Sequence, residues 1–544
     1  MTKRRLDRGR VRRGIDWHRL ARGYCLSKWR IKSLDSILAT AEKKSLTRSL
    51  GAFQLTMLGI GGIIGTGIFV LTAEAAQLAG PGMLISFVLS ALVCGLAALC
   101  YAELAAMVPV SGSAYTYSYA TFGEILAWIV GWALVLEYAV AASAVAVGWS
   151  GYMVGVLDNF LGVQLPPALV SGPYAGGIIN LPAVVIALAV TWLLVLGTKE
   201  SATVNSVLGT VKVVALAAFI FLAVPAATAD KFQPFLPLGA TGAIGAASII
   251  FFAFVGFDAV STAAEETKNP QRNIPIGLIA SLGICTVFYM LVGAGVIGSY
   301  GAQPVFGPNG EALQPGSPEL VAQCKTFAEA TLPVVCSNEA LAHVLRAIGH
   351  PGVGNVLGLA AGFALPSVVL MMMFAQTRVF FVMSRDGLLP GMLSKVHPKY
   401  GTPHVVTIIT GLGVAISAAF FPVGQLASVS NGGTLCAFFF VSLAIMTLRR
   451  TDPDRRRAFR TPAVWLVAPL AAAGCLLLFG FLSWVAQLVF FGWAAIGLVF
   501  YFIYGRTRSN VARGITVVGE LDPNVPPQGV PPLPGIHTPG GKDA

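Results

Sequence analysis

The stretch GIGGIIGTGIF, residues 59–69, lies inside a long apolar run and carries five glycines in eleven positions. Glycine weakens a helix, and a membrane offers no water to bind the backbone groups of an interrupted one. Two interpretations are open. Either small residues let another helix approach closely, or the helix breaks there and its backbone groups bind a ligand.

The composition is that of an integral membrane protein. Of 544 residues, 56% are hydrophobic and 11% are charged, whereas soluble domains carry about 25% charged residues. The net charge is +12, but residues 1–50 alone hold 15 Lys and Arg against 4 acids. A basic tail beside a membrane span is typical of a cytoplasmic segment near anionic lipid headgroups, so nucleic-acid binding is disfavoured.

Apolar stretches of about 20 residues, enough to cross about 30 Å of hydrocarbon, recur along the chain. We place them at 52–74, 81–107, 124–152, 179–197, 202–223, 241–263, 275–298, 352–378, 404–421, 429–448, 462–480 and 483–504. The expected fold is therefore an all-α integral membrane protein with about 12 transmembrane helices. Residues 1–50 form a basic cytoplasmic tail, 51–505 the transmembrane domain, and 506–544 a Pro/Gly-rich C-terminal tail that we expect to be disordered.

Loop charges predict the orientation. With the N-terminus inside, the inner loops hold 13 Lys and Arg and the outer loops 3, which is the bias of a protein with cytoplasmic termini. We expect a bacterial inner or plasma membrane location. Cys324 and Cys336 then lie outside, where either a disulfide or two free thiols would fit.

Several chemistries find no support in the sequence. Histidines and cysteines show no metal-ligand spacing, so no metal or other cofactor is expected. A phosphate-cradling glycine loop of the Walker type is missing, which argues against ATP-driven transport. No nucleophile–base pair lies in the spans, so an enzyme is the weakest hypothesis.

Polar or helix-breaking residues lie near the middle of several spans. They are Gly65–Gly67 in the first span, Glu137 in the third, Lys212 in the fifth, Asp258 in the sixth, and Pro366 with Ser367 in the eighth. A charge at the bilayer centre costs about 2.5–3.5 kcal/mol. Gly61 and Gly65 also fit close helix packing, and Glu137 would equally fit a hydrogen bond across the bundle. Lys212, roughly 15 Å deep, is too far from either interface for easy snorkelling.

The positions of the anomalies favour a transporter. Spans one and six are five crossings apart, so they run in opposite directions, as an inverted five-plus-five repeat requires. Broken helices in matching positions of two halves indicate a binding site near the membrane centre. We therefore interpret the glycines as a break, accompanied by close packing. Repeat one would cover 51–223, repeat two 241–448, and two extra C-terminal helices 462–504.

The direction of each span predicts the chemistry of its break. In span one, the N–H groups of about Gly65, Thr66 and Gly67 become free, and such amides suit a carboxylate. In span six, carbonyls near Phe252–Val255 become free and, with that of Ile63, suit an ammonium group. An anion site facing a cation site at one depth fits a zwitterion, which is an α-amino acid.

Longer motifs carry a family resemblance. They are GIGGIIGTGIFV, YAELAAMVPVSGSAYTYSYATFGE, GWALVLEY, FFAFVGFDAVSTAAEETKNPQRNIPIGL and QTRVFFVMSRDGLLP. Through them, residues 45–505 resemble the bacterial members of the cationic amino acid transporter family, in the amino acid–polyamine–organocation superfamily. The resemblance implies secondary transport by alternating access. The two extra C-terminal spans of animal members are missing here.

The resemblance also implies roles for single residues. The family's carboxylate motif matches Gly65, Thr66 and Gly67, and its amine-binding carbonyls match Ile63, Phe252, Ala253 and Val255, with the Phe252 ring shielding the substrate. Lys212 matches the lysine that replaces a sodium ion in proton-driven members, with Gly61 and Ser367 as its partners. Glu137 matches an acid near the site. Leu365, with Pro366, departs from the Met-Thr/Ser frequent in relatives, and its apolar wall favours small or aliphatic substrates.

Three hypotheses follow. The first is an amino acid symporter with the proton as coupling ion, the second an amino acid exchanger, and the third a non-transporting sensor. In the third, the basic tail would bind a cytoplasmic partner. Apolar surroundings disfavour the charged form of a lysine, so in the first hypothesis Lys212 gains a proton facing outside and loses it facing the cytoplasm. Membrane lipid is the expected surrounding, and a cytoplasmic or small membrane-protein partner stays open.

Overall fold

A computed structural model describes residues 30–32, 34, 37, 50–109, 113–197, 202–262, 267–328 and 331–515. Within these ranges the chain is almost entirely helical, and pairing between extended segments is limited to isolated bridges such as the one that joins Leu50 to Thr267. The basic N-terminal segment before residue 30 and the C-terminal segment after residue 515 lie outside the described residues.

The helices fall into a long and a short group. In the part of the chain that the structure describes, six segments are long and apolar enough to cross a membrane: Leu71–Met107, Glu124–Leu161, Pro270–Ser299, Pro351–Arg385, Val423–Thr451 and Trp484–Arg508. They contain α5 (Leu71–Ala79), α6 (Met83–Met107), α8 (Glu124–Leu161), α14 (Pro270–Ser299), α17 (Pro351–Arg385), α19 (Val423–Thr451) and α21 (Trp484–Phe500). Shorter apolar helices are α3 (Ala52–Ile63), α10 (Leu181–Leu196), α11 (Ala202–Ala223), α12 (Gly239–Ile250), α18 (His404–Phe420) and α20 (Val464–Gly480). The all-helical prediction is confirmed for the described residues, and the count of twelve spans stays a prediction.

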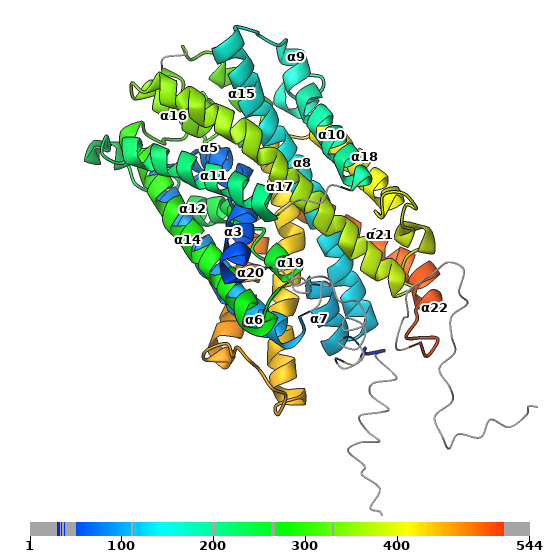
Figure 1. Cartoon of the computed structure of the whole chain (residues 1–544). Coiled ribbons are helices and arrows are strands. Elements are labelled where there is room, and N and C mark those ends of the chain that lie inside the picture. The colour runs from blue at the N-terminus through cyan, green and yellow to red at the C-terminus, as the bar shows by residue number, and fades with distance from the viewer. Residues whose placement is uncertain are drawn as a thin grey trace, which may run out of the picture.

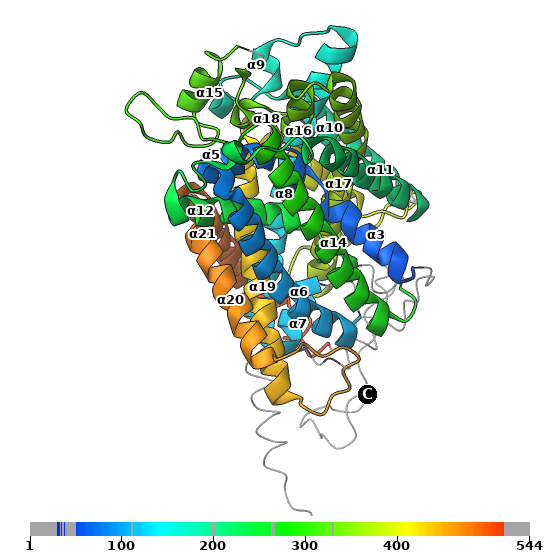
Figure 2. The same ribbon diagram turned by 90° about the vertical axis from the view of Figure 1, so that its left-hand side faces the viewer.

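The helices form one bundle around α8. Helix α8 packs along both α17 and α19, while α14 packs against α6 and α3, so the first apolar stretch lies between long helices (Figures 1 and 2). Large apolar side chains also cover the outside of the bundle, for example Phe221 at 78% and Phe363 at 70% exposure. Soluble monomers rarely expose large contiguous apolar patches, so this surface fits contact with lipid.

Both predicted interruptions are present. Helix α3 ends at Ile63, Ile64 and Gly65 are extended, and α4 (Thr66–Phe69) begins one residue later. Helix α12 ends at Ile250 and passes through a 3₁₀ turn, η4 (Phe251–Phe254). The backbone then turns at Gly256, whose φ of +114° favours glycine, before α13 (Ala259–Thr262).

The loop between α14 and α17 is fastened to the first apolar stretch. The buried Gln77 amide of α5 donates to the carbonyls of Val305 and Leu313, and its oxygen accepts the Val305 N–H, all at 2.8 Å. Further along the loop, Cys324 and Cys336 form a disulfide with a Cα–Cα distance of 5.5 Å. The structure therefore selects the disulfide over two free thiols.

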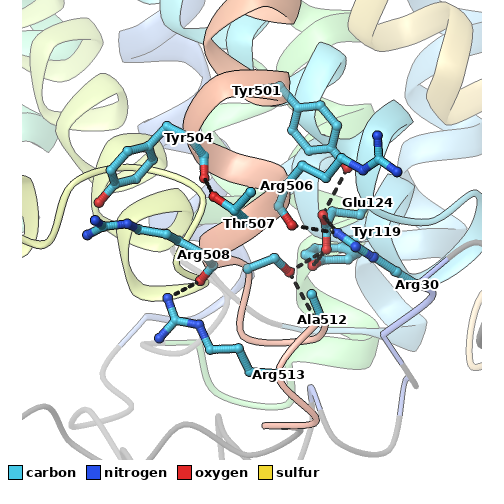
Figure 3. Close-up of polar contacts among 11 residues, drawn as sticks. Arg30, Tyr119, Glu124, Tyr501, Tyr504, Arg506, Thr507, Arg508, Ala512 and Arg513 are labelled. Atoms are coloured by element: carbon cyan, nitrogen blue, oxygen red, sulfur yellow. Dashed lines mark hydrogen bonds and ion pairs between the residues drawn. The ribbon is translucent and has the colours of Figure 1, made fainter.

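The described ends of the chain meet on Glu124, the first residue of α8. Its carboxylate accepts from Arg30 Nη1 at 2.9 Å, from Tyr501 Oη at 2.9 Å and from Tyr119 Oη at 3.1 Å, and it also binds the Ser509 hydroxyl (Figure 3). These residues lie at the opposite end of the bundle from α15 (Pro318–Cys324) and α16 (Ala340–Ala347) (Figure 1).

This network corrects the predicted C-terminal tail. The Pro- and Gly-rich composition predicts disorder from residue 506, but α22 (Arg506–Arg508) and the turn after it are packed against the bundle. Asn510 donates its side-chain amide to Arg385 O at 2.8 Å and its backbone N–H to Asp386 O at 3.0 Å. Hydrogen bonding to the end of α17 therefore orders the segment up to residue 515, which a reading of Pro and Gly content could not anticipate.

Candidate functional site

The break in the first apolar stretch leaves backbone donors without partners. Among the described residues, no acceptor pairs with the N–H groups of Gly65, Thr66 or Gly67. The Gly65 carbonyl is used, because it accepts from Ile68 and Phe69 at 3.3 Å. All of these residues are buried, and an unpaired buried N–H group is unfavourable. These three amides are therefore suited to a ligand with negative charge.

The second break lies against the first. A Cβ on Gly256 would lie 2.8 Å from the Gly62 carbonyl oxygen, and a Cβ on Gly67 would lie 2.9 Å from the Ala253 nitrogen. Real Cβ atoms do not approach so closely, so glycine permits this contact between the two broken segments. The structure therefore shows both a broken helix and close packing at the glycines, and ligand binding by the broken segment stays a prediction.

A tyrosine outside the predicted site residues joins the two breaks. Tyr289 of α14 is fully buried, and its hydroxyl lies 2.9 Å from Ile63 O and 3.0 Å from Ala253 O. A carbonyl oxygen has two lone pairs, so either oxygen can still accept from a ligand amine. The signal was a tyrosine in the middle of an apolar span, but its partners depend on the tertiary fold.

The remaining carbonyls and the aromatic ring belong to the same segment. Phe252 O accepts the Val255 N–H at 3.2 Å, which closes the 3₁₀ turn. Phe252, Ala253 and Val255 are 6%, 1% and 3% exposed. The structure therefore brings the predicted carbonyls together with the predicted amides in one buried region.

Lys212 lies on the other side of the first break. Its Nζ donates to Gly61 O at 2.8 Å and to Ser367 Oγ at 3.2 Å, and the residue is 1% exposed. Ser367 in turn donates to Ala364 O at 2.7 Å. The amine thus links α11 to α3 and α17 at the turn before the interruption.

Helix α17 supplies an apolar wall. The Val368 methyl carbons lie 3.5 Å from where a Cβ on Gly65 would be, so this helix faces the break directly. Leu365 is fully buried and stands three residues earlier, on the same side of the helix.

Glu137 is not joined to the broken segments by any hydrogen bond among the described residues. Thr66 Oγ1 donates to Val145 O at 3.5 Å, and Glu137 stands eight residues before Val145 on α8, about 12 Å along the axis. Its backbone carbonyl accepts from Ser430 Oγ at 3.1 Å. The structure therefore places this acid beside α19, deeper toward the Glu124 end of α8.

Metal-ligating residues do not gather in the described part of the chain. No group of three or more His, Cys, Asp or Glu side chains there could hold a metal ion. The polar groups of the candidate site are instead backbone amides, backbone carbonyls, one lysine and the hydroxyls of Tyr289, Ser367 and Thr66.

Comparison with known proteins identifies the family of this chain. The model of the amino acid permease family matches residues 50–505. The branched-chain amino acid permease BcaP of Bacillus subtilis (strain 168) is 46% identical over 490 residues, covering 89% of this chain and 99% of that protein. The methylthioribose transporter of the same organism is 41% identical over 486 residues, with the same coverage.

More distant relatives carry other substrate names. The vacuolar cationic amino acid transporter 2 of Arabidopsis thaliana is 33% identical over 441 residues, which are 80% of this chain and 65% of the plant protein. The family model spans the bundle with both interruptions, and the two Bacillus relatives align over nearly their whole length. This chain is therefore a multi-pass membrane protein of the amino acid permease family, within the amino acid–polyamine–organocation superfamily.

Proposed function

We propose that this protein imports L-amino acids by proton symport through alternating access. The observation that carries the proposal is the Lys212 amine bonded to Gly61 O, one turn before a break that exposes amides beside the carbonyls of a second break. Twelve spans, an inverted repeat of 51–223 and 241–448, extra helices at 462–504 and cytoplasmic termini belong to this proposal. A bacterial inner or plasma membrane is the proposed location.

In this proposal the two breaks bind the two charges of the substrate. Its carboxylate accepts from the N–H groups of Gly65, Thr66 and Gly67, which have no acceptor among the described residues. Its ammonium group donates to the carbonyls of Ile63, Phe252, Ala253 and Val255. The Phe252 ring covers the substrate, and Leu365 contacts its side chain.

The proposed substrates are neutral amino acids with aliphatic side chains. Leu365 and Val368 give α17 an apolar surface beside Gly65, and an apolar wall discriminates against a charged side chain by leaving it unpaired. The name of the 46% identical relative, a branched-chain amino acid permease, supports the same class.

Lys212 is the proposed proton carrier. Protonated, it holds α11, α3 and α17 together through Gly61 and Ser367, which stabilises the outward-facing form. Loss of the proton to the cytoplasm removes a donor from this contact and loosens it. Transport should therefore rise as external pH falls and should need no sodium.

Uptake into proteoliposomes under an imposed pH gradient tests the proposal. Wild type should accumulate labelled leucine when the outside is acidic. Lys212→Ala should lose pH-driven accumulation, and so should Lys212→Arg, because arginine stays protonated. Lys325→Ala, in the outer loop, is the matched control and should transport normally.

The alternatives give different results in the same vesicles. An exchanger would need internal substrate for uptake, and a sensor would bind substrate without moving it. Sodium-dependent uptake, or unchanged proton dependence in Lys212→Ala, contradicts the proposed mechanism. A thermal-shift panel of leucine, valine, arginine, lysine and methylthioribose identifies the ligand class, because a ligand that binds the folded state raises its stability.

A further inference from the structure

The end of α19 and the loop that leads to α20 carry a dense group of arginines. Residues 449–460 read RRTDPDRRRAFR, with six arginines and two acids. We call residues 449–461 the arginine loop. It lies where α19 ends and α20 begins, drawn in orange at the lower end of the bundle in Figure 2. The proposed transport mechanism uses none of its residues.

A buried acid fixes both ends of the arginine loop to α6. Glu103 of α6 is fully buried, and a buried carboxylate requires pairing. Arg449 Nη2 donates to Glu103 Oε2 over 2.8 Å, and Arg457 Nε lies 3.0 Å from Glu103 Oε1. The backbone N–H of Thr461 also donates to Glu103 Oε2 over 2.7 Å, and the Thr461 hydroxyl donates to Leu99 O over 2.9 Å.

The Arg457 side chain fixes the middle of the loop. Its Nη2 donates to Leu448 O at 3.1 Å and to Asp452 O at 2.7 Å, and its Nη1 donates to the carbonyls of Pro453 and Arg455, both at 2.9 Å. One guanidinium group therefore satisfies carbonyls at the C-terminal end of α19, where a cation is favourable. The backbone conformation of the loop is set by these contacts.

Three arginines of the loop take no part in this anchoring. Arg450, Arg456 and Arg460 are exposed. Arg456 and Arg460 have no hydrogen-bond or ion-pair partner among the described residues, and each adjoins an anchored residue in the chain. Four positions separate these two arginines, so their Cα atoms lie at most about 14 Å apart. The loop therefore holds several unpaired guanidinium groups close together.

Arg450 connects this group of charges to the lipid-facing surface. Its guanidinium carbon lies 4.9 Å from the centre of the Trp465 ring at the start of α20. Trp465 is 53% exposed, and Leu466 and Leu470 continue the exposed apolar surface along α20. Tryptophan is enriched at membrane–water interfaces, so the exposed arginines lie at the depth of the lipid headgroups.

We propose that Arg450, Arg456 and Arg460, together with Trp465, bind the phosphate headgroup of an anionic phospholipid. A guanidinium group matches a phosphate with two parallel hydrogen bonds, and basic groups beside a membrane span attract anionic lipids. The acyl chains would lie on the apolar surface of α20 that begins at Leu466. In the proposed orientation this lipid belongs to the inner leaflet, but the contact itself depends on neither the substrate nor the coupling ion.

Thermal unfolding of the purified full chain in a non-ionic detergent tests the site. The protein is titrated with dioleoylphosphatidylglycerol, which is anionic, or with dioleoylphosphatidylcholine, which is zwitterionic. A lipid that binds the folded state raises the melting temperature. Wild type should respond to the anionic lipid at a concentration at least about tenfold lower, and native mass spectrometry should show anionic lipid retained on the protein.

The combined variant Arg450→Gln/Arg456→Gln/Arg460→Gln should lose this preference, because it removes the unpaired guanidinium groups and leaves the anchoring contacts intact. Lysine at the same three positions should restore only part of it, since an ammonium group cannot form the paired hydrogen bonds. The matched control removes the same charge from exposed residues elsewhere, as Lys268→Gln/Lys395→Gln/Lys399→Gln, and should keep the preference.

Three outcomes would overturn the inference. Unchanged preference in the arginine variant would show that these side chains bind no lipid, and an equal loss in the lysine control would show an effect of net charge alone. Equal stabilisation by inorganic phosphate or by glycerophosphoglycerol, which has the headgroup without acyl chains, would show a site for a free phosphate compound.

Single substitutions decide if the combined arginine variant does not fold. Each of the three should then weaken the response to the anionic lipid, and wild-type responses in all three would contradict the proposal. Protein that transports no substrate would contradict the proposed function, whereas the lipid titration would still decide this site.

Discussion

Gly65 and Gly67 stand two residues apart, but the fold leaves different space at each. A Cβ at position 65 would meet the Val368 methyl groups at an ordinary 3.5 Å, whereas one at position 67 would collide with the backbone of Ala253. Gly65 is also extended, with φ near −147°, which an alanine adopts without strain. Substitutions at Gly65 and Gly67 therefore test ligand binding and helix packing separately.

We expect Gly65→Ala to fold with a wild-type melting temperature and to bind leucine at least about tenfold more weakly, because its methyl group enters the proposed carboxylate site. Gly67→Ala should instead lower the melting temperature, since it forces the broken segments apart. Thermal unfolding with and without leucine measures both effects. Wild-type affinity in Gly65→Ala would mean that the glycine serves packing alone.

Tyr289→Phe tests the hydroxyl that joins the two breaks. The change removes a buried hydrogen bond to Ile63 O or Ala253 O, which contributes about 0.5–1.5 kcal/mol. Without this bond the two carbonyl groups are no longer held in the positions that the ligand amine requires. We expect a lower melting temperature and weaker leucine binding. Tyr300→Phe is the control, because its hydroxyl donates to Leu332 O in the loop between α14 and α17, and it should leave affinity unchanged.

The importance of a single residue could be predicted where it depends on the depth of that residue in the membrane. A lysine about ten residues into an apolar span signals a function without any knowledge of its neighbours. Tyr289 gave a weaker signal, because a tyrosine carries no charge and its partners Ile63 and Ala253 are distant in the sequence. The Tyr138–Asp258 bond also needed the tertiary structure, because 120 positions separate the partners.

At the scale of helices, breaks were easier to predict than ends. The glycine cluster and the central Gly256 mark the interruptions because they change backbone conformation locally. Helix α8 continues to Leu161 and α17 to Arg385, beyond the predicted ends at 152 and 378. Apolarity delimits only the part inside hydrocarbon, and a helix can extend into water with polar side chains.

Glu124 binds Arg30 near the N-terminus and both Tyr501 and Ser509 near the C-terminus. Removing its charge should therefore loosen the structure locally, around these contacts. Glu124→Gln should weaken the bonds to Arg30, Tyr501 and Ser509, and bonds to a charged group contribute about 1.5–3 kcal/mol. Hydrogen exchange should therefore become faster in residues 501–515, with little change in the interior of α8. Glu319→Gln, on the opposite end of the bundle, should leave these rates unchanged. Equal protection in both variants would show that the network does not hold the C-terminal segment.

For the whole molecule, the disulfide and the loop charges point to the same orientation. The Cys324–Cys336 loop lies at one end of the bundle, and the Glu124 network with Arg506 and Arg508 lies at the other (Figure 1). Disulfides persist in oxidising environments, and Lys and Arg concentrate on the cytoplasmic side. Both observations predict that the disulfide loop faces outward.

Native cysteines provide a direct test of that orientation. Cys25 lies in the N-terminal segment outside the described residues, and of the other free cysteines four are buried and Cys436 is partly buried. In intact spheroplasts, a membrane-impermeant maleimide should label the protein only after mild reduction, and Cys324→Ser/Cys336→Ser should abolish this signal. Permeabilised cells should add a label that Cys25→Ser removes, since the N-terminus is expected in the cytoplasm. Labelling of Cys25 in intact spheroplasts would show that the N-terminus is outside. The proposed direction of proton movement through Lys212 would then also be reversed.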